Sequence, residues 1–344
     1  MRIVRVGLDL AKYVFEVHAV DARGKVVLRK RLRRDAVSNF FANVPPCLIG
    51  MEASNGAHYW ARILSGLGHE VRLISPQFVT PYVKSNKNDQ NDAEAICEAV
   101  GRPTMRFVAM KSVEQLSVQA VHRIRSRLIK GRTQLVNQVR GILAEQGIVI
   151  ARNIAKLRQS LSDIAGSNDN SLSDLIRALL LELQQELTDL DHRIVAYDRR
   201  IRELYRSSEV CQRLGKVEGI GPLSATALMA AIGDRQCFKN GRQFAAWLGL
   251  VPRQMSTGDR TILGRLSTRG NSYLRMLFMQ AARVILSRPA NWPKHSFGAW
   301  LVRAAQRLHP NVLAAALANK LARIAWTVLV QERNYEAHVT RAAA

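Results

Sequence analysis

The stretch IVRVGLDLAKYVFEVHAVDARGKVVLRKRL, residues 3–32, decides the fold of the first part of the chain. Residues 3–9 form a short apolar run that ends in an aspartate, residues 13–21 alternate with period two, and residues 26–32 follow a short turn. Apolar alternation bounded by turn residues is typical of β-strands. The stretch therefore predicts a meander of three strands.

The residues that follow alternate between apolar strands and amphipathic helices. Helices are expected at 35–43, 57–68 and 89–100, and strands at 47–53 and 70–75. A meander followed by alternating strands and helices is the element order of an α/β ribonuclease H-like fold, in which the first and fourth strands are neighbours. Residues 1–110 are therefore expected to form a domain of this kind.

Four carboxylates stand at the ends of these elements. Asp9 and Glu52 each end an apolar strand, and Asp89 and Asp92 share one face of the last expected helix. Acidic groups crowded at buried strand ends repel one another, and a divalent cation neutralises them. Mg²⁺ prefers such hard oxygen ligands, and Mn²⁺ is able to substitute for it. The pattern predicts a metal site for phosphodiester chemistry.

Each acid also has an ordinary structural interpretation. Asp92 suits the cap of the helical segment AEAICEAV, and a single Asp after a strand is often a turn former. Glu94 and Glu98, on the same helix, are the acids most easily mistaken for ligands. The order of the four acids along the expected elements favours the metal site.

The composition indicates a polyanionic partner. The chain has 51 Lys and Arg against 27 Asp and Glu, a formal charge of +24 and a pI of about 10.8. Such a balance attracts nucleic acid. No continuous apolar run reaches the ~18 residues of a membrane-spanning helix, and the first residues form a strand rather than a signal peptide. We expect a soluble, cytoplasmic, nucleoid-associated protein with no membrane partner.

The cysteines do not indicate a metal site or a disulfide framework. They are scattered without paired spacing, at Cys47, Cys97, Cys211 and Cys237. We expect structural or incidental thiols, because free cysteines are usually buried.

The middle region, residues 111–206, is expected to be helical. In its second half apolar residues recur at steps of four and three, as in a coiled coil. They are Ile176, Leu180, Leu183, Leu187, Leu190, Ile194, Tyr197, Ile201 and Leu204. A dimer and an antiparallel helical hairpin within one chain satisfy this pattern equally, and the polar segment 165–171 suits the hairpin tip. Arg123, Arg127 and Lys130, on one face of the first half, are expected to contact phosphates or else to be only solvated.

The last region, residues 207–344, is expected to be mainly helical. Residues 217–228 have the form of a helix-hairpin-helix, with Gly219 and Gly221 in the turn and a helix that begins at Pro222. A tight glycine turn lets backbone amides approach a DNA phosphate without reading its sequence. An ordinary helix C-cap also uses glycine, so this motif alone does not establish DNA binding.

A loop rich in hydroxyls and arginines is expected after Pro252, before a helix that begins near Asn271. Hydroxyls beside Gly258 suit an oxygen nucleophile that faces a phosphate, and nearby guanidinium groups offset the charge of the transition state. The flanking arginines are Arg253, Arg260, Arg265 and Arg269. The same loop suits simple phosphate binding, because no His or paired acid nearby is an evident base.

These motifs together resemble a known family. The segments GLDLAK, GMEASNG, KNDQNDAEA and PRQMSTGDRTILGRLSTRGNSYLR, with the glycine turn, are similar to the DEDD transposases of a group of bacterial insertion sequences. Members are site-specific recombinases guided by a structured bridge RNA. The resemblance covers residues 3 to 330 and implies that Asp9, Glu52, Asp89 and Asp92 form a RuvC-like Mg²⁺ site. It also implies that a serine of the last region attacks the DNA backbone and holds it as a phosphoserine.

The identity of the nucleophile is open between two hydroxyls. The family motif commonly places serine directly before the glycine, whereas this chain has Ser256-Thr257-Gly258. We expect Ser256, because a primary hydroxyl is less hindered than a β-branched one, and Thr257 is the alternative. Ser267 and Ser272 are remoter candidates.

The expected function is recombination of donor and target DNA by a homo-oligomer, a dimer or a tetramer, with a guide RNA. It needs no ATP, and the sequence has no GxxxxGK[ST] loop. One alternative is a junction-resolving endonuclease that uses metal-activated water, with the last region only binding DNA. The other is a nucleic-acid scaffold without catalytic activity, in which the acids are structural.

Overall fold

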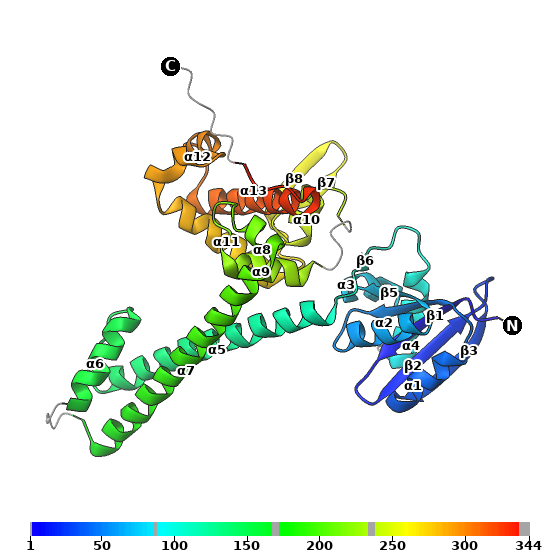
Figure 1. The fold of residues 1–344 in the computed structure, drawn as a ribbon, viewed down its shortest axis with the longest axis horizontal. Helices are drawn as coiled ribbons and strands as arrows, with labels where there is room; N and C mark the ends of the chain where they lie inside the picture. Colours follow the sequence, from blue (N-terminus) through cyan, green and yellow to red (C-terminus); the bar gives the residue numbers. More distant parts are fainter. Residues whose placement is uncertain (1, 85–87, 167–171, 233–237, 337–344) are drawn as a thin grey trace. The chain divides into compact units, whose positions relative to one another are not determined.

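The computed structural model describes residues 2–84, 88–166, 172–232 and 238–336, which divide into two compact units (Figure 1). The N-terminal unit contains the chain through Gln115 together with Ile232. The C-terminal unit contains the other described residues, from Leu116 on. The expected middle and last regions thus belong to one unit, and the division into three domains stays a prediction.

A single six-stranded sheet forms the centre of the N-terminal unit. Its strands are β1 (Arg5–Leu10), β2 (Val14–Val20), β3 (Val26–Arg33), β4 (Leu48–Glu52), β5 (Glu70–Ile74) and β6 (Phe107–Val108). Their order in the sheet is β3-β2-β1-β4-β5-β6. β1 runs antiparallel to β2 and parallel to β4, which is itself parallel to β5. The predicted meander and the adjacent first and fourth strands are confirmed.

Helices cover both faces of this sheet. They are α1 (Val37–Ala42), α2 (Ala57–Gly66), α3 (Pro76–Val79) and α4 (Asp89–Val100), with short 3₁₀ turns η1 (Arg34–Ala36) and η2 (Thr80–Tyr82). Alternate residues of a strand point to opposite faces. Val6 and Leu8 are accordingly buried in one core with Phe41 and Trp60, whereas the intervening Gly7 faces α4.

Two glycines allow α4 to lie directly against the sheet. A Cβ added to Gly7 would stand 2.0 Å from the carbonyl oxygen of Ala93. A Cβ added to Gly50 would stand 2.7 Å from the Cβ of Val100. Gly7 and Gly50 are paired residues of β1 and β4. We call this pair the glycine notch, and it fixes α4 against β1 and β4 at backbone distance.

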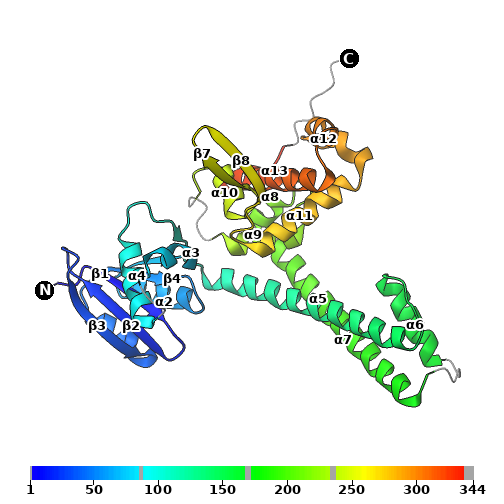
Figure 2. The same cartoon turned by 180° about the vertical axis from the view of Figure 1, so that it is seen from behind.

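The C-terminal unit is mostly helical (Figures 1 and 2). Its helices are α5 (Val113–Glu145), α6 (Ile154–Gly166), α7 (Asp174–Arg206), α8 (Glu209–Leu214), α9 (Pro222–Ala231), α10 (Gly241–Trp247), α11 (Ser272–Leu286), η4 (Pro289–Lys294), α12 (Gly298–Ala305) and α13 (Pro310–Gln331). The strands β7 (Pro252–Thr257) and β8 (Arg260–Leu266) form a hairpin. The middle region therefore holds α6 between the two expected helices, and the expected tip at 165–171 lies largely outside the described residues.

Helices α5 and α7 run antiparallel within the chain. Two ion pairs show their register: Arg125 Nε to Asp198 Oδ1 at 2.5 Å, and Arg132 Nη1 to Asp191 Oδ1 at 3.0 Å. Seven residues forward along α5 thus correspond to seven residues back along α7. The apolar residues of α7 at the same spacing are buried, and they are Leu180, Leu187, Ile194 and Ile201. The antiparallel alternative of the heptad pattern is therefore present within one chain, and a dimer through this seam stays a prediction.

Helix α13 is the central apolar helix of the C-terminal unit. Among the described residues it is the one helix long and apolar enough to span a membrane, with a mean hydropathy of 1.4 over 18 residues. Half of that stretch is buried inside the protein, and Lys320 and Arg323 interrupt it. Its apolar character is accounted for by the core that it forms with α10 and α11.

The cysteines in the described part of the chain are buried free thiols. They are Cys47, Cys97 and Cys211. Burial raises the pKa of the Cys47 thiol to about 11, as expected for an unreactive core thiol. Cys237 lies outside the described residues.

Candidate active site

Three of the four predicted acids come together at the end of β1. One carboxylate oxygen from each of Asp9, Asp89 and Asp92 lies within 4.8 Å of the others. Asp9 comes from β1, and the other two come from the first turn of α4. No other group of this kind, with three or more His, Cys, Asp or Glu side chains in ligating range, occurs among the residues that the structure describes.

The glycine notch explains why these carboxylates meet. Gly7 and Asp9 are two residues apart on β1 and therefore face the same side of the sheet. Because α4 lies on Gly7, its first turn reaches the level of Asp9. The Asn88 side chain begins α4 by accepting a hydrogen bond from the Gln90 amide at 3.0 Å. Asp92 therefore does not serve as the N-cap, and its carboxylate faces the cluster.

The two aspartates of α4 and burial together raise the proton affinity of Asp9. The pKa of Asp9 rises to about 6, because burial, then Asp92 and Asp89, disfavour its charged form. Glu52 contributes a smaller effect in the same direction. A carboxylate raised in this way is characteristic of a site whose charge is completed by a cation.

Glu52 and Glu16 border the cluster. Glu52 ends β4 beside β1, as predicted, but it is not among the three residues whose oxygens converge. Glu16 lies directly across from Asp9 in the β1–β2 pair and is 8% exposed. Burial raises its pKa, Arg31 opposes this at 3.4 Å, and Asp89 adds to the rise. Glu16 was not among the predicted site residues, although the hairpin register of β1 and β2 was a signal that could have located it.

Glu94 and Glu98 are engaged elsewhere. Glu94 accepts from Lys84 Nζ at 3.0 Å and from Arg29 Nη2 at 3.2 Å, and the hydrogen bond with Lys84 lowers its pKa. Glu98 pairs with Arg102, which follows the end of α4. Both acids have cationic partners of their own, in agreement with the expectation that they only mimic ligands.

The cluster suits a hard divalent cation. All its donors are carboxylate oxygens, and opposite ligands of an Mg²⁺ octahedron are about 4.2 Å apart. The 4.8 Å spread of the three oxygens is within a small side-chain adjustment of that value.

The expected serine loop is a β-hairpin. Strands β7 and β8 pair from Pro252 opposite Leu266 to Thr257 opposite Arg260, with a register shift after Pro252. The two-residue loop has Gly258 at φ +54°, the position at which a type II′ turn takes glycine. The expectation of an irregular loop is wrong, because a hairpin exposed on both faces lacks the apolar alternation that marks a half-buried strand.

The hairpin places the two candidate nucleophiles on opposite faces. Ser256 is paired across the strands with Thr261 and accepts a hydrogen bond from Gln254 Nε2 at 2.8 Å. Thr257 is paired with Arg260 and shares its face with Met255. Both hydroxyl residues are exposed. A phosphate that approaches one face of the hairpin meets one hydroxyl and not the other.

The remoter candidates, Ser267 and Ser272, lie outside the exposed faces of the hairpin. Ser272 is the first residue of α11, which Asn271 caps by accepting from the Leu274 amide at 3.0 Å. The Ser267 hydroxyl is buried without a hydrogen-bond partner among the described residues, and its amide donates to Val251. Neither hydroxyl belongs to the exposed faces of β7 and β8.

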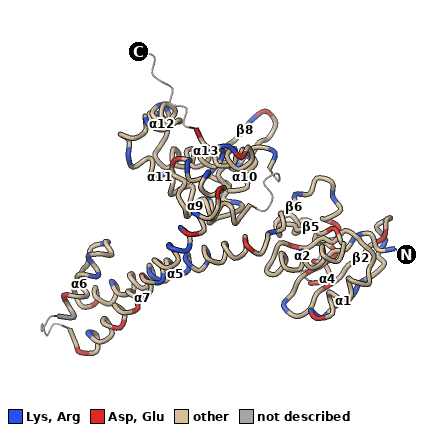
Figure 3. The backbone as a smooth tube through the Cα atoms, in the orientation of Figure 1, with Lys and Arg blue, Asp and Glu red and all other residues tan. Residues whose placement is uncertain are grey.

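The predicted cationic residues are exposed. Arg253, Arg260, Arg265 and Arg269 line the hairpin and the segment after it, and Arg123, Arg127 and Lys130 lie on the solvent face of α5. None of them forms an ion pair with an acid in the described part of the chain, whereas Arg125 and Arg132 on the same helix pair with acids of α7. Figure 3 shows the basic positions of α5.

The glycines lie in the segment 215–221, between the end of α8 at Leu214 and the start of α9 at Pro222, and the helix-hairpin-helix stays a prediction. Gly219 has φ +82°, which favours glycine, and a Cβ added there would stand 3.0 Å from Ile285 Cδ1 on α11. Gly221 faces open space before α9 begins at Pro222. The turn is thus anchored on α11 at one glycine and open at the other, and its use on DNA stays a prediction.

Comparison with known families matches two parts of the chain. The family described as "Transposase IS116/IS110/IS902 family" matches residues 211–296. The family DEDD_Tnp_IS110, described as "Transposase", matches residues 6–147. The first match contains the glycine turn and the hairpin, and the second contains all four predicted acids.

Three relatives are similar over almost their whole length. A Pseudomonas aeruginosa protein named "Probable family 20 transposase" is 50% identical over 97% of this chain and 99% of its own. The transposase for insertion sequence element IS1328 of Yersinia enterocolitica is 41% identical over 96% of this chain and 97% of its own. The transposase for IS1111A of Coxiella burnetii is 41% identical over 96% of this chain and 90% of its own.

Proposed function

The chain belongs to the IS110 family of DEDD transposases and is a DNA transposase of an insertion sequence, and on that premise we propose how it cuts and rejoins DNA. The proposed reaction is Mg²⁺-dependent, site-specific strand exchange through a phosphoserine. The observation that carries it is the convergence of Asp9, Asp89 and Asp92 within 4.8 Å. Three ionised acids at that separation repel one another strongly unless a cation is bound between them. A divalent cation held by carboxylates in this way is suited to phosphodiester chemistry.

The acidic residues hold the metal in this proposal. Asp9, Asp89 and Asp92 supply inner oxygens, and Glu52 completes the set from the neighbouring strand. When bound, Mg²⁺ supplies Lewis-acid polarisation of the scissile phosphate and stabilises charge on the departing oxygen. Mn²⁺ offers the same oxygen coordination and is expected to substitute.

Ser256 supplies the nucleophile. Its Oγ forms a bond to phosphorus while the bond from phosphorus to one sugar oxygen breaks; the serine proton passes to a base and the sugar oxygen takes up a proton. In the reverse step a sugar hydroxyl of the partner strand attacks the phosphoserine and frees Ser256. One phosphodiester is lost and one is formed, so no ATP is needed. The hydrogen bond from Gln254 fixes the Ser256 oxygen and leaves its proton available.

The remaining partners follow from charge and from the family. We propose that Arg253, Arg260, Arg265 and Arg269 contact phosphates near the hairpin, and that Arg123, Arg127 and Lys130 track a backbone along α5. Strand exchange joins two duplexes, so a homodimer or a homotetramer is proposed, acting in the cytoplasm at the nucleoid. A bridge RNA as guide is the proposed source of site choice.

A covalent-adduct assay tests the nucleophile. Wild-type protein with Mg²⁺ and a nicked target that traps the intermediate should give a protein–DNA adduct that survives denaturing electrophoresis. Ser256→Ala should bind DNA and form no adduct, whereas Thr257→Ala and the control Ser272→Ala should keep it.

The other outcomes of this assay have definite meanings. Adduct from Ser256→Ala together with none from Thr257→Ala makes the threonine the nucleophile. Cleavage by wild type without any adduct identifies a junction-resolving nuclease that uses metal-activated water. Absence of metal binding and of cleavage leaves a scaffold, and the proposal is then wrong.

A further inference from the structure

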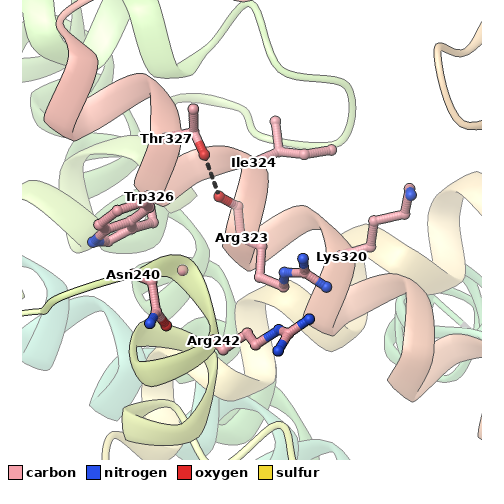
Figure 4. A pocket seen from close by; sticks show the side chains of 8 residues that line it. Asn240, Arg242, Lys320, Arg323, Ile324, Trp326 and Thr327 are labelled. Carbon is pink, nitrogen blue, oxygen red and sulfur yellow. Dashed lines mark hydrogen bonds between the residues drawn. The ribbon is translucent and has the colours of Figure 1, made fainter.

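A cavity of about 500 Å³ lies between α10 and α13 and is lined by three cationic side chains (Figure 4). Arg242 comes from the first turn of α10, and Lys320 and Arg323 come from successive turns of α13. Ile324 and Trp326 add apolar surface. Figure 4 shows the side chains of Arg242 and Arg323 extending toward the same space.

A close helix contact fixes the geometry of this cavity. Gly241 begins α10 directly on α13, because a Cβ there would stand 3.2 Å from Arg323 Cα and 3.3 Å from its carbonyl oxygen. Asn240 caps α10 by accepting from the Gln243 amide at 3.0 Å. The residue that follows this contact, Arg242, is therefore held opposite Arg323 by rigid backbone rather than by a loop.

The cavity has no carboxylate partner among the described residues. Its eight lining residues include no acid, and the sequence contains neither Asp nor Glu from residue 260 through 331. Arg242 and Arg323 are exposed, whereas the partly buried Arg125 and Arg132 of the same unit pair with Asp198 and Asp191. Within the described residues, the cations of this cavity therefore have no opposite charge beside them.

Unpaired like charges around one concave space create a field that favours an anion. Cations that share a cavity repel one another, and walls of low dielectric focus their potential into it. The pKa of Lys320 is lowered in this environment, first by burial and then by the charge of Arg323. Its Nζ lies 5.1 Å from the centre of the Trp300 ring on α12.

We propose that this cavity is a nucleic-acid phosphate site, in which Arg242 and Arg323 clamp one backbone phosphate and Lys320 contacts the same phosphate or the next. Arginine forks suit phosphate oxygens in pairs, and contacts of this kind set position without reading sequence. The volume accommodates a phosphate with its adjoining sugar, from DNA or RNA. The inference rests on the proposed function only for the choice of a nucleic acid as the anion.

A charge-matched pair of variants tests the site. Arg242→Gln with Arg323→Gln removes two charges from the cavity, and Arg303→Gln with Arg307→Gln removes two exposed charges from the same unit. Binding of full-length protein to a 30-base-pair duplex and to a single-stranded RNA is measured against salt concentration, with EDTA present. The cavity variant should flatten the slope of log affinity against log salt by about 1.8 on DNA or about 1.4 on RNA.

The two polymers distinguish the source of the phosphate. A change on duplex DNA alone assigns the site to DNA, and a change on RNA alone assigns it to RNA. Equal effects from the cavity variant and its control, or no effect from the cavity variant on either polymer, overturn the proposal. The charge-conserving pair Arg242→Lys with Arg323→Lys guards against misfolding, because it should restore most of the slope.

Failure of the proposed function is distinguishable in the same experiments. The salt dependence is measured without divalent metal, so it does not depend on cleavage or on Ser256. If wild type forms no covalent adduct but the cavity variant has a flatter salt dependence of affinity, the phosphoserine mechanism is contradicted and the phosphate site is supported. If wild type forms the adduct and the cavity variant has an unchanged salt dependence, the mechanism is supported and the phosphate site is contradicted.

Discussion

The carboxylate cluster and the serine hairpin position their reactive groups by opposite means. Asp9, Asp89 and Asp92 lie on a buried sheet and a helix fixed to it through the glycine notch. Ser256 lies on a two-stranded ribbon whose strands are exposed on both faces. Packing holds the first group, whereas only strand alternation and one hydrogen bond orient the second. Metal ligands need fixed mutual distances, and a nucleophile that must join and leave a phosphate needs a defined face.

The largest effect should come from the carboxylates themselves. Asp9→Asn or Asp92→Asn should lower the cleavage rate about 1,000-fold or more, because the site loses a ligand that the reaction requires, while DNA affinity stays close to wild type. Single-turnover cleavage with Mg²⁺ measures this. Glu98→Gln, on the same helix but paired with Arg102, is the control and should cleave normally. Wild-type rates in either Asp variant would remove the metal assignment.

The glycine notch should be nearly as sensitive, although it carries no reactive group. Gly7→Ala would place a methyl 2.0 Å from the Ala93 carbonyl oxygen and so push α4 and its two aspartates away from Asp9. We expect a loss of unfolding free energy of ~1–3 kcal/mol and a large loss of cleavage. Denaturant unfolding and cleavage assays measure both.

A helical glycine without neighbours provides the comparison for this variant. A Cβ at Gly66 meets nothing within 4 Å, so Gly66→Ala should be neutral or slightly stabilising. If Gly7→Ala keeps both stability and cleavage, packing through the notch does not position the acids.

The basic face of α5 should show a smaller effect, on binding alone. Replacing Arg123, Arg127 and Lys130 with Ala should flatten the salt slope of affinity by ~2–3 if each meets a phosphate. RNA is the first polymer to test, followed by duplex DNA. A second triple variant, Lys294→Ala, Arg303→Ala and Arg307→Ala, removes equal charge from another surface. Identical slopes for the two triple variants would mean that the α5 residues are only solvated.

The smallest effect should be on the stability of the metal-free protein. The folded pKa of Asp9 is about 6 against an ordinary value of 3.8, so the native state holds its proton more tightly than the unfolded state. This contribution to stability is present below pH ~4 and is lost as pH rises through about 6. Asp9→Asn removes the charge, so with EDTA at pH 7.5 its Tm should exceed that of wild type by ~2–4 °C.

Thermal unfolding across pH checks the sign of this effect. The difference in Tm between Asp9→Asn and wild type should be near zero at pH 4 and should grow until about pH 7. Mg²⁺ should raise the Tm of wild type and leave the variant nearly unchanged. A variant that is less stable than wild type at pH 7.5 in EDTA would contradict the idea of repulsion within the cluster.

Sequence patterns predicted the N-terminal unit closely because its strands have one or both faces buried. The helix expected at 89–100 is α4 with the same bounds, and the fourth strand expected at 47–53 is β4, Leu48–Glu52. Each pattern reflects burial, which is what hydrophobic periodicity measures. The strand β6 was missed because two residues are too short to show a period.

The hairpin and the cationic cavity were missed for a different physical reason. In β7 and β8 even Met255 and Leu263 are more than 60% exposed, so no buried face imposes alternation on the sequence. Arg242 and Arg323 are far apart in the chain, and only the packing of α10 on α13 brings them together. Local patterns describe single elements, whereas a site shared by two elements depends on tertiary contact.

The ion pairs between α5 and α7 allow the length of this helical pair to change only in fixed steps. Adding seven residues to one helix alone would move Arg125 and Arg132 out of line with Asp198 and Asp191. Adding seven to both, one matched heptad, would keep the ion pairs and the apolar seam and lengthen the pair by about 10.5 Å. The distance spanned by these helices can thus evolve, or be engineered, in increments of one heptad.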